Sequence, residues 1–383
     1  MAGSQAVRGP SETGGPLLLT CGPVTTSQSV KDAMVRDLGS RDAGFRALNR
    51  EVLGRLAEVA NASGTHVAVP VPGSATLAVE AMLTTLVPRT GKVLLLVNGV
   101  RGERAKRICL VAGRRIAVHE MREEMPPDLE ALDGALRADP TITHVFVVHC
   151  ETASGMLNPV AGIADVVATH GRRLLIDGAS AFGALPLDAA STAFDAVAAA
   201  SDRCLEGVPG LGFVICREAS LAQARGNAAS LALDLHDQWQ HLATTGRYRF
   251  TPPTQVIAAL HQALGELQAE GGQPGRGRRY AQNCKVLIEG MRALGFRPLL
   301  PDRLQSPTVV AFRMPKAERF LFQDFCDKLK ARGYVIDPGT HGLFGCFHVG
   351  CIGRLDAGNI EGAVSAVAGV LAELGIKSLA SAA

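Results

Sequence analysis

Between residues 66 and 216 the chain repeats one pattern, in which a short apolar run is followed by a helix-length segment. Several of the apolar runs are rich in Val and Ile without alternating polar residues, which is typical of strands buried on both faces. Strands that alternate with helices predict a mostly parallel sheet covered by helices. We predict seven strands, at 66–71, 92–97, 115–119, 144–149, 173–177, 195–199 and 212–216.

The rest of the chain predicts a second, smaller unit. A length of 383 residues favours about two domains. Long helical patterns cover about 255–270 and 276–294 and are separated by a Gly-rich break, and short strands and helices follow after residue 300. We therefore predict a disordered tail over 1–15, a large α/β domain over 16–260, and long helices with a small C-terminal α+β domain over 261–383.

Composition excludes several classes of protein. The net charge is +3, and Lys and Arg are spread along the chain rather than gathered in a basic patch, so nucleic acid is not an expected partner. No apolar run approaches the 18 residues of a membrane span, and the first 15 residues have no apolar core of a signal peptide. Nine scattered cysteines without a Cys-x-x-Cys pair favour a reducing compartment, so we expect a cytoplasmic protein with no membrane partner.

Three soft metal ligands lie close together near the C-terminus, at Cys346, His348 and Cys351. Their spacing matches none of the usual zinc patterns, and no second ligand pair lies nearby. We expect no metal site.

A first candidate for ligand binding follows the first strand, at Gly73-Ser74-Ala75-Thr76. Backbone N–H groups and hydroxyls at the start of a helix suit a phosphate group. Ser and Thr are also the preferred residues for capping a helix, so capping alone is the alternative explanation.

Two further candidates follow later strands of the same sheet. Asp177 ends a buried strand, where a carboxylate is costly unless it is paired, and a pyridinium nitrogen is a suitable partner that also strengthens a cofactor as an electron sink. The loop 151–156 brings polar groups, among them Thr152, after the fourth strand, with an ordinary turn as the alternative. Ligands of open parallel sheets collect beyond the carboxyl ends of the strands, so these loops predict one cofactor site.

The segment that would carry a Schiff-base lysine to such a cofactor has none. No lysine occurs between Lys106 and Lys285, and the reactive position, between the sixth strand and the glycine-rich turn 207–210, is Arg203. A Schiff base requires a neutral amine, whereas a guanidinium stays protonated because its pKa lies above about 12. Arg203 therefore cannot replace the lysine chemically.

The chain resembles the 2-aminoethylphosphonate:pyruvate aminotransferase family, whose members are class V, fold-type I pyridoxal-phosphate enzymes. The resemblance runs in order from residue 17 to about 375. It is carried by the segments 18–26, 73–81, 98–104, 151–159, 207–210, 230–235 and 250–254.

The resemblance implies a homodimer with active sites at the subunit interface, and pyridoxal 5'-phosphate as the cofactor. It implies transfer of the amino group of 2-aminoethylphosphonate to pyruvate, which gives phosphonoacetaldehyde and alanine. Carried over by position, Ser74, Ala75 and Thr76 would hold the cofactor phosphate. Thr152 would contact the ring hydroxyl and Asp177 the ring nitrogen, and Thr254 would reach the phosphate of the neighbouring subunit's cofactor.

The sequence departs from the family pattern at three positions. The lysine is Arg203, the aromatic residue that stacks on the cofactor ring is Arg101, and the arginine that grips the anionic end of the substrate is His348. We expect the planar guanidinium of Arg101 to stack on the cofactor ring. We expect His348 to bind an anion when it is protonated, and Arg354 is a second candidate for this contact. For Arg203 we expect an ion pair with the cofactor phosphate or with a bound phosphonate.

Three functions stay open from the residues. The first is a 2-aminoethylphosphonate transaminase, slowed because the lysine also serves as the base that moves the proton, a role worth about 10² to 10⁴ in rate. The second is a catalytically inactive homologue with a binding, regulatory or partner-subunit role. The third is a different reaction, which predicts turnover without alanine.

Overall fold

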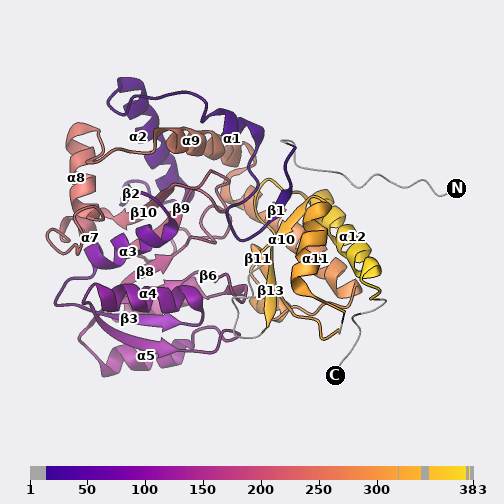
Figure 1. Ribbon diagram of the computed structural model, residues 1–383. Coiled ribbons are helices and arrows are strands. Elements are labelled where there is room, and N and C mark those ends of the chain that lie inside the picture. Colours follow the sequence, from indigo (N-terminus) through magenta and orange to yellow (C-terminus); the bar gives the residue numbers. More distant parts are fainter. Residues whose placement is uncertain (1–13, 318, 338–344, 377–378, 380–383) are drawn as a thin grey trace.

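The computed structural model describes residues 14–317, 319–337, 345–376 and 379. The chain forms a large α/β unit and a smaller unit beside it, built mainly from the C-terminal third (Figure 1). Of the tail predicted over 1–15, residues 1–13 lie outside the described residues.

A seven-stranded sheet is the centre of the large unit. Its strand order is β2-β10-β9-β8-β5-β3-β4, and every neighbouring pair is parallel except the two that β10 makes with β2 and β9. All seven predicted strands are confirmed, with ends within two residues. Their bounds are β2 (His66–Pro72), β3 (Lys92–Val97), β4 (Arg115–Glu120), β5 (Ile142–Val148), β8 (Arg173–Asp177), β9 (Ala196–Ala200) and β10 (Leu211–Arg217).

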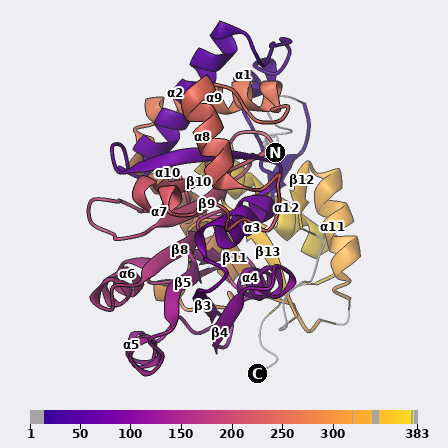
Figure 2. The same ribbon diagram turned by 90° about the vertical axis from the view of Figure 1, so that its left-hand side faces the viewer.

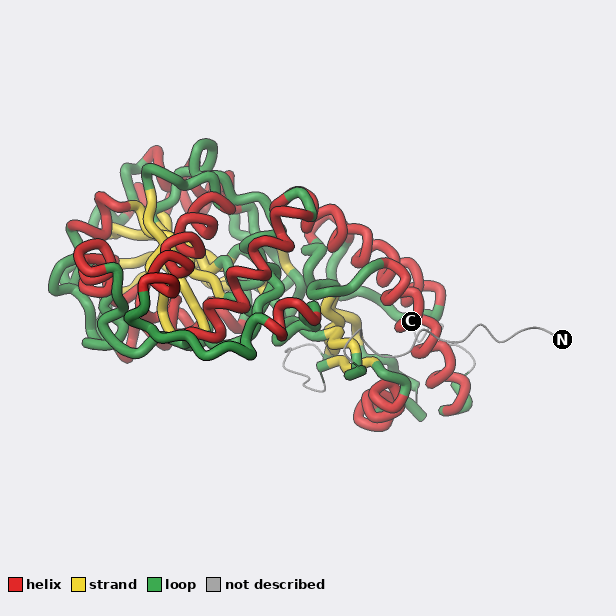
Figure 3. Tube along the Cα trace, turned by 90° about the horizontal axis from the view of Figure 1, so that it is seen from above, coloured by secondary structure: helices red, strands yellow, loops and turns green. Residues whose placement is uncertain are grey.

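Helices cover both faces of this sheet (Figure 3). Strand β5 is apolar over residues 145–148 because both of its faces are buried there. Val145 and Val147 pack into the core on one face, and Phe146 and Val148 pack into the core on the other. One face is covered by α2 (Ala43–Val59), α5 (Leu129–Ala138), α6 (Val160–Thr169) and α9 (Thr254–Ala269). The other face is covered by α3 (Ala75–Leu86), α4 (Val100–Val111), α7 (Glu218–Ala222) and α8 (Leu235–Thr245).

The smaller unit is built on two short sheets and three helices. They are grouped on the right of the molecule in Figure 1, and in Figure 2, which is seen from the left of Figure 1, they lie farther from the viewer than the large unit. Its core is aromatic, and Phe296 and Phe347 lie 5.6 Å apart between ring centroids. Its elements are β1 (Leu17–Leu19), β11 (Val309–Arg313), β12 (Tyr334–Ile336), β13 (Cys346–Gly350), α10 (Gly272–Ala293), α11 (Phe322–Ala331) and α12 (Ala357–Glu373). The remaining short elements are α1 (Gln28–Asp32), β6 (Cys150–Glu151), β7 (Met156–Leu157) and the 3-10 turn η1 (Asp302–Leu304).

Two boundaries differ from the sequence expectation. Strand β1 pairs in parallel with β12, so residues 17–19 belong to the smaller unit although they precede the large one in sequence. Helix α10 begins at Gly272, four residues earlier than expected, because Gly271 has a left-handed φ of 95° that turns the chain and Pro274 falls in the first turn, where no N–H is needed. No helix among the described residues is long and apolar enough to cross a membrane.

Candidate active site

The polar loops predicted from the sequence meet at one edge of the sheet. Strands β2, β3, β5, β8 and β9 run in one direction, so their carboxyl ends open on the same side. The side chains from these loops contact one another: Arg101 bridges Thr152 and Asp177, and Arg104 contacts Thr76. The predicted residues at 101, 152 and 177 are therefore in contact, and Thr76 contacts the same helix, α4, that carries Arg101.

The loop after β2 leaves its hydroxyl groups available for a ligand. Ser74 is the N-cap residue of α3, but its side chain makes no capping hydrogen bond, so capping alone does not explain a serine here. The hydroxyl of Thr76 accepts a hydrogen bond from Nη1 of Arg104 at 3.2 Å. Ala75 between them is buried. Arg104 was not singled out from the sequence, and it adds a cation to a helix N-terminus that already favours anions.

Asp177 is buried at the end of β8 and already has two partners. Its Oδ1 accepts the backbone N–H of Ala179 at 2.9 Å, and its Oδ2 lies 3.4 Å from Nη1 of Arg101. The side chains of Arg101 and Asp177 are 10% and 6% exposed, so this ion pair is shielded from water. Nε of Arg101 also donates to the hydroxyl of Thr152 at 3.3 Å. The guanidinium thus contacts both groups that were expected to hold the edge of a cofactor ring.

Glu151 fixes the backbone from which Arg101 extends. Its buried carboxylate accepts the N–H groups of Arg101 at 3.2 Å and Gly102 at 2.9 Å, and so caps the start of α4. Burial raises the pKa of Glu151 to about 7, although these N–H groups and the charge of Arg101 act in the opposite direction. A Cβ at Gly99 would lie 2.6 Å from Cδ of Glu151, so the glycine in this loop makes room for the carboxylate. We did not predict this role from the sequence.

Arg203 lies in the loop after β9 and is paired with its chain neighbour. Its Nη1 is 2.6 Å from Oδ2 of Asp202. The guanidinium packs against Gly22, where φ is 131° and any Cβ would overlap it, so the glycine accommodates the arginine. No described lysine lies in the loops that follow β2, β3, β5, β8 and β9.

Helix α10 holds the loop that carries Arg203. Glu206, buried and with a left-handed φ of 59°, accepts hydrogen bonds at 2.6 Å from the hydroxyl of Tyr280 and from Nη2 of Arg279. Arg276 donates from Nη1 to the main-chain oxygen of Cys204 at 2.7 Å. This network joins the large unit to the first helix of the smaller one and rigidifies the 203–207 loop.

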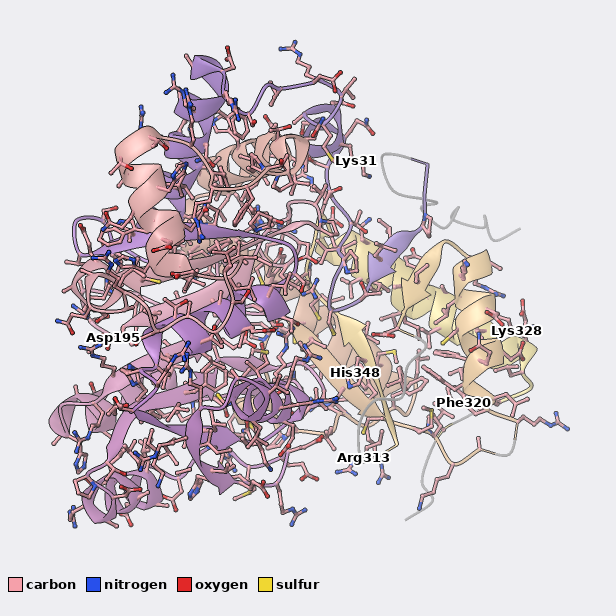
Figure 4. All side chains as sticks on the ribbon, turned by 60° about the vertical axis from the view of Figure 1, so that its left-hand side comes forward. Lys31, Asp195, Arg313, Phe320, Lys328 and His348 are labelled. Atoms are coloured by element: carbon pink, nitrogen blue, oxygen red, sulfur yellow. The ribbon has the colours of Figure 1, made fainter. Side chains whose placement is uncertain are left out.

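The predicted substrate residues occupy different surroundings. His348 is buried on β13 at the side of the smaller unit that faces the large one (Figure 4), and its Nε2 lies 2.5 Å from the main-chain oxygen of Ala153. Arg354 is exposed and donates its backbone N–H to Thr25 at 2.7 Å. Thr254, at the start of α9, is buried and donates to Oε1 of Gln255. Among the described residues, His348 forms no metal-ligand group with the neighbouring cysteines.

The sequence profile of the family described as "Aminotransferase class-V" matches residues 28–344. The chain belongs to this family. It is 50% identical over 359 residues to a 2-aminoethylphosphonate–pyruvate transaminase of Pseudomonas putida (strain GB-1), a match that covers 94% of this chain and 98% of that one. It is 48% identical over 366 residues to 2-aminoethylphosphonate–pyruvate transaminase 2 of Burkholderia lata, a match that covers 96% of this chain and 97% of that one.

The fold of this class-V aminotransferase is confirmed by solved structures. The pyridoxamine-pyruvate aminotransferase of Mesorhizobium loti superposes with a TM-score of 0.85 at 26% identity and covers 96% of this chain and 95% of that chain. The predicted fold-type I architecture and family are thereby confirmed. Pyridoxal 5'-phosphate is the cofactor that belongs with this family and fold.

The residues present fit this cofactor in part. The free hydroxyl of Ser74, the hydroxyl of Thr76 and the cation of Arg104 suit a phosphate, and Asp177 suits a ring nitrogen. Covalent attachment to a lysine of these loops does not fit, because the loop after β9 carries Arg203 and no described lysine lies in the loops that follow β2, β3, β5, β8 and β9. The side of the site toward Asp177 is also taken up by Arg101.

Proposed function

We propose that the chain is a 2-aminoethylphosphonate–pyruvate transaminase-like protein of phosphonate degradation that holds pyridoxal or pyridoxamine phosphate without a covalent bond. The observation that carries this proposal is the identity of 50% over 94% of the chain to a transaminase with this donor and acceptor in its name. Its substrates are then 2-aminoethylphosphonate as the amino donor and pyruvate as the acceptor.

The chain's own residues bind and orient the cofactor. Ser74 and Thr76, with the N-terminal end of α3 at Ala75, hold the phosphate, while Thr152 and Asp177 contact the edge of the ring. When bound, the cofactor supplies an electron sink for the carbon from which a proton is removed.

Arg203 cannot perform the two tasks of a lysine at its position. Its guanidinium stays charged, so it is neither a nucleophile nor a base at neutral pH. General acid and base catalysis is worth about 10² to 10⁴ in rate, and we expect amino-group transfer to be slowed by that order. Arg203 does supply a positive charge, which pairs with Asp202 and lies against Gly22.

The anionic end of the substrate is assigned to His348, with Arg354 as the second candidate. A proton at both ring nitrogens makes His348 a cation that can bind a phosphonate or carboxylate. Its buried position beside Ala153, in the loop that also carries Thr152, supports this role. The exposed side chain of Arg354 offers the weaker support.

We further propose a cytoplasmic homodimer, in which Thr254 contacts the cofactor phosphate of the neighbouring subunit. Thr254 begins a long helix after two prolines, and its buried hydroxyl lies at that helix N-terminus. This location supports a phosphate contact.

A second function is favoured by the two arginines: a catalytically inactive homologue with a binding, regulatory or partner-subunit role. Arg101 and Arg203 replace the two residues of the family pattern that touch the reactive part of the cofactor, while Ser74, Thr76 and Asp177 are retained. Changes at the reactive positions, with the contacts to the phosphate and the ring nitrogen kept, are what a protein that binds without turnover would show.

The two functions are separated by an assay of alanine formation from 2-aminoethylphosphonate and pyruvate with added pyridoxal phosphate, for the wild type and Arg203→Lys. The transaminase proposal predicts slow alanine formation by the wild type and a rate at least 100-fold higher for Arg203→Lys. If both proteins take up the cofactor but only Arg203→Lys forms alanine, the wild type is the catalytically inactive homologue. If neither forms alanine although both take up cofactor, the assignment of donor and acceptor is wrong.

A further inference from the structure

The side chain of Arg101 lies where a cofactor ring would have to make its charged contact. Nη1 of Arg101 lies 3.4 Å from Oδ2 of Asp177, and Nε lies 3.3 Å from the hydroxyl of Thr152. The sequence predicted that this guanidinium would stack on the face of the ring. The structure instead places it at the edge, on the acceptors themselves.

The reason is the charge of Asp177. A carboxylate that is 6% exposed is stable only with a cation or strong donors beside it. Its Oδ1 is occupied by the N–H of Ala179, which leaves Oδ2 for a cation. A pyridinium supplies that cation in a pocket that contains the cofactor, and in this chain the guanidinium of Arg101 supplies it.

We infer that Arg101 is a built-in competitor of the cofactor ring, and that its guanidinium has to leave Asp177 and Thr152 before the ring can bind. This inference rests on the proposed function, because it takes pyridoxal or pyridoxamine phosphate as the ligand. It adds a residue that sets the affinity for the cofactor, distinct from Arg203, which sets the chemistry.

The geometry allows the guanidinium to leave without a change of the backbone. Both of its contacts are long for hydrogen bonds, at 3.3 and 3.4 Å, so they are readily exchanged. The backbone N–H of Arg101 is held separately by Glu151 at the start of α4. Rotation about the side-chain bonds therefore moves the cation while the helix stays in place.

The competition is confined to the ring. Oδ1 of Asp177 is taken by a backbone N–H and Oδ2 by the guanidinium of Arg101, so the pyridinium would need the position that the guanidinium occupies. The phosphate end is separate: Ser74 makes no capping bond, and Thr76 is contacted by Arg104 rather than Arg101. Arg101 is therefore expected to weaken binding of the ring without affecting binding of the phosphate.

The test uses pyridoxamine 5'-phosphate, whose amine cannot condense with lysines, so that all binding measured is noncovalent. Its dissociation constant is measured by equilibrium dialysis for the wild type, Arg101→Met and Arg107→Met. Arg107 is exposed on the same helix and gives the matched loss of one positive charge. We expect Arg101→Met to bind at least 10-fold more tightly than the wild type, and Arg107→Met to bind like the wild type.

Each outcome decides a different claim. If the wild type binds and Arg101→Met binds equally or more weakly, the inference is overturned while the proposed function stands. If no folded variant binds pyridoxamine phosphate or pyridoxal phosphate, the proposed function fails and the inference with it.

A second measurement needs no cofactor. A double-mutant cycle of Arg101→Met and Asp177→Asn on the midpoint of thermal unfolding measures the coupling of the ion pair directly. We expect Arg101→Met to lower the midpoint in the presence of Asp177 and to lower it less when Asp177 is already Asn. Equal shifts in both backgrounds would show that the two side chains are not paired and would overturn the inference.

Discussion

Arg203 and Asp202, adjacent in the chain, form an ion pair of 2.6 Å between Nη1 and Oδ2. The pair provides a local partner for the guanidinium of Arg203, beside Gly22, which leaves space for it. The loop after β9 therefore holds a paired arginine, and a guanidinium does not supply the neutral amine that a Schiff base requires.

The hydroxyl of Ser74 is expected to serve the cofactor phosphate and not the helix. Because it makes no capping bond, Ser74→Ala should leave the unfolding midpoint nearly unchanged. A hydrogen bond to a charged group contributes about 1.5 to 3 kcal/mol, so the affinity for pyridoxamine phosphate should fall roughly 10- to 100-fold. Pyridoxamine without the phosphate is the matched ligand, and an equal loss of affinity for both would contradict the assignment.

Glu206 is expected to be a stability residue of the 203–207 loop. Glu206→Gln removes the charge that two buried or half-buried arginines of α10 share, and should lower the free energy of unfolding by about 3 to 5 kcal/mol in chemical denaturation. Tyr280→Phe, which loses one hydroxyl, should cost about 1 kcal/mol. Glu103→Gln, at an exposed ion pair, serves as the control and should change little. Similar values for Glu206→Gln and this control would contradict the role.

The buried carboxylate of Glu151 predicts a pH dependence of stability. Its pKa of about 7 in the folded protein lies above the ordinary value of 4.5, so the folded state binds the proton more tightly than the unfolded state. Stability from this group is present below about pH 4.5 and is lost as pH rises to about 7, by about 3 kcal/mol. The difference in free energy of unfolding between the wild type and Glu151→Gln should therefore change by that amount between pH 4.5 and 7.5. A difference that is constant with pH would contradict the shifted pKa.

The sequence predicted the sheet well because its strands are simple. Most of the seven are short apolar runs bounded by loops, as in β3 (Lys92–Val97), and a parallel arrangement follows from the helices between them. It did not predict that β1 would pair with β12, since the two segments are more than 300 residues apart and β1 has only three residues. Pairing of so short a strand depends on tertiary contacts rather than on its own pattern.

The site was predicted in its residue types more than in its contacts. Asp177 and Thr152 were placed at the carboxyl edge because a strand end fixes the backbone position. The direction of the Arg101 side chain could not be predicted, because a long side chain has many rotamers and the choice here is made by the buried charge of Asp177. The same holds for Glu151, whose partners are backbone N–H groups in the first turn of α4.

Covalent bonding between the cofactor and a lysine can be measured directly. The wild type and Arg203→Lys are incubated with pyridoxal phosphate and reduced with borohydride, and the modified residues are located by peptide mass spectrometry. We predict no modified lysine near the site in the wild type and one stoichiometric adduct at position 203 in the variant. A stoichiometric lysine adduct in the wild type, whose formation is prevented by excess pyridoxamine phosphate, would contradict the claim that the cofactor is held noncovalently.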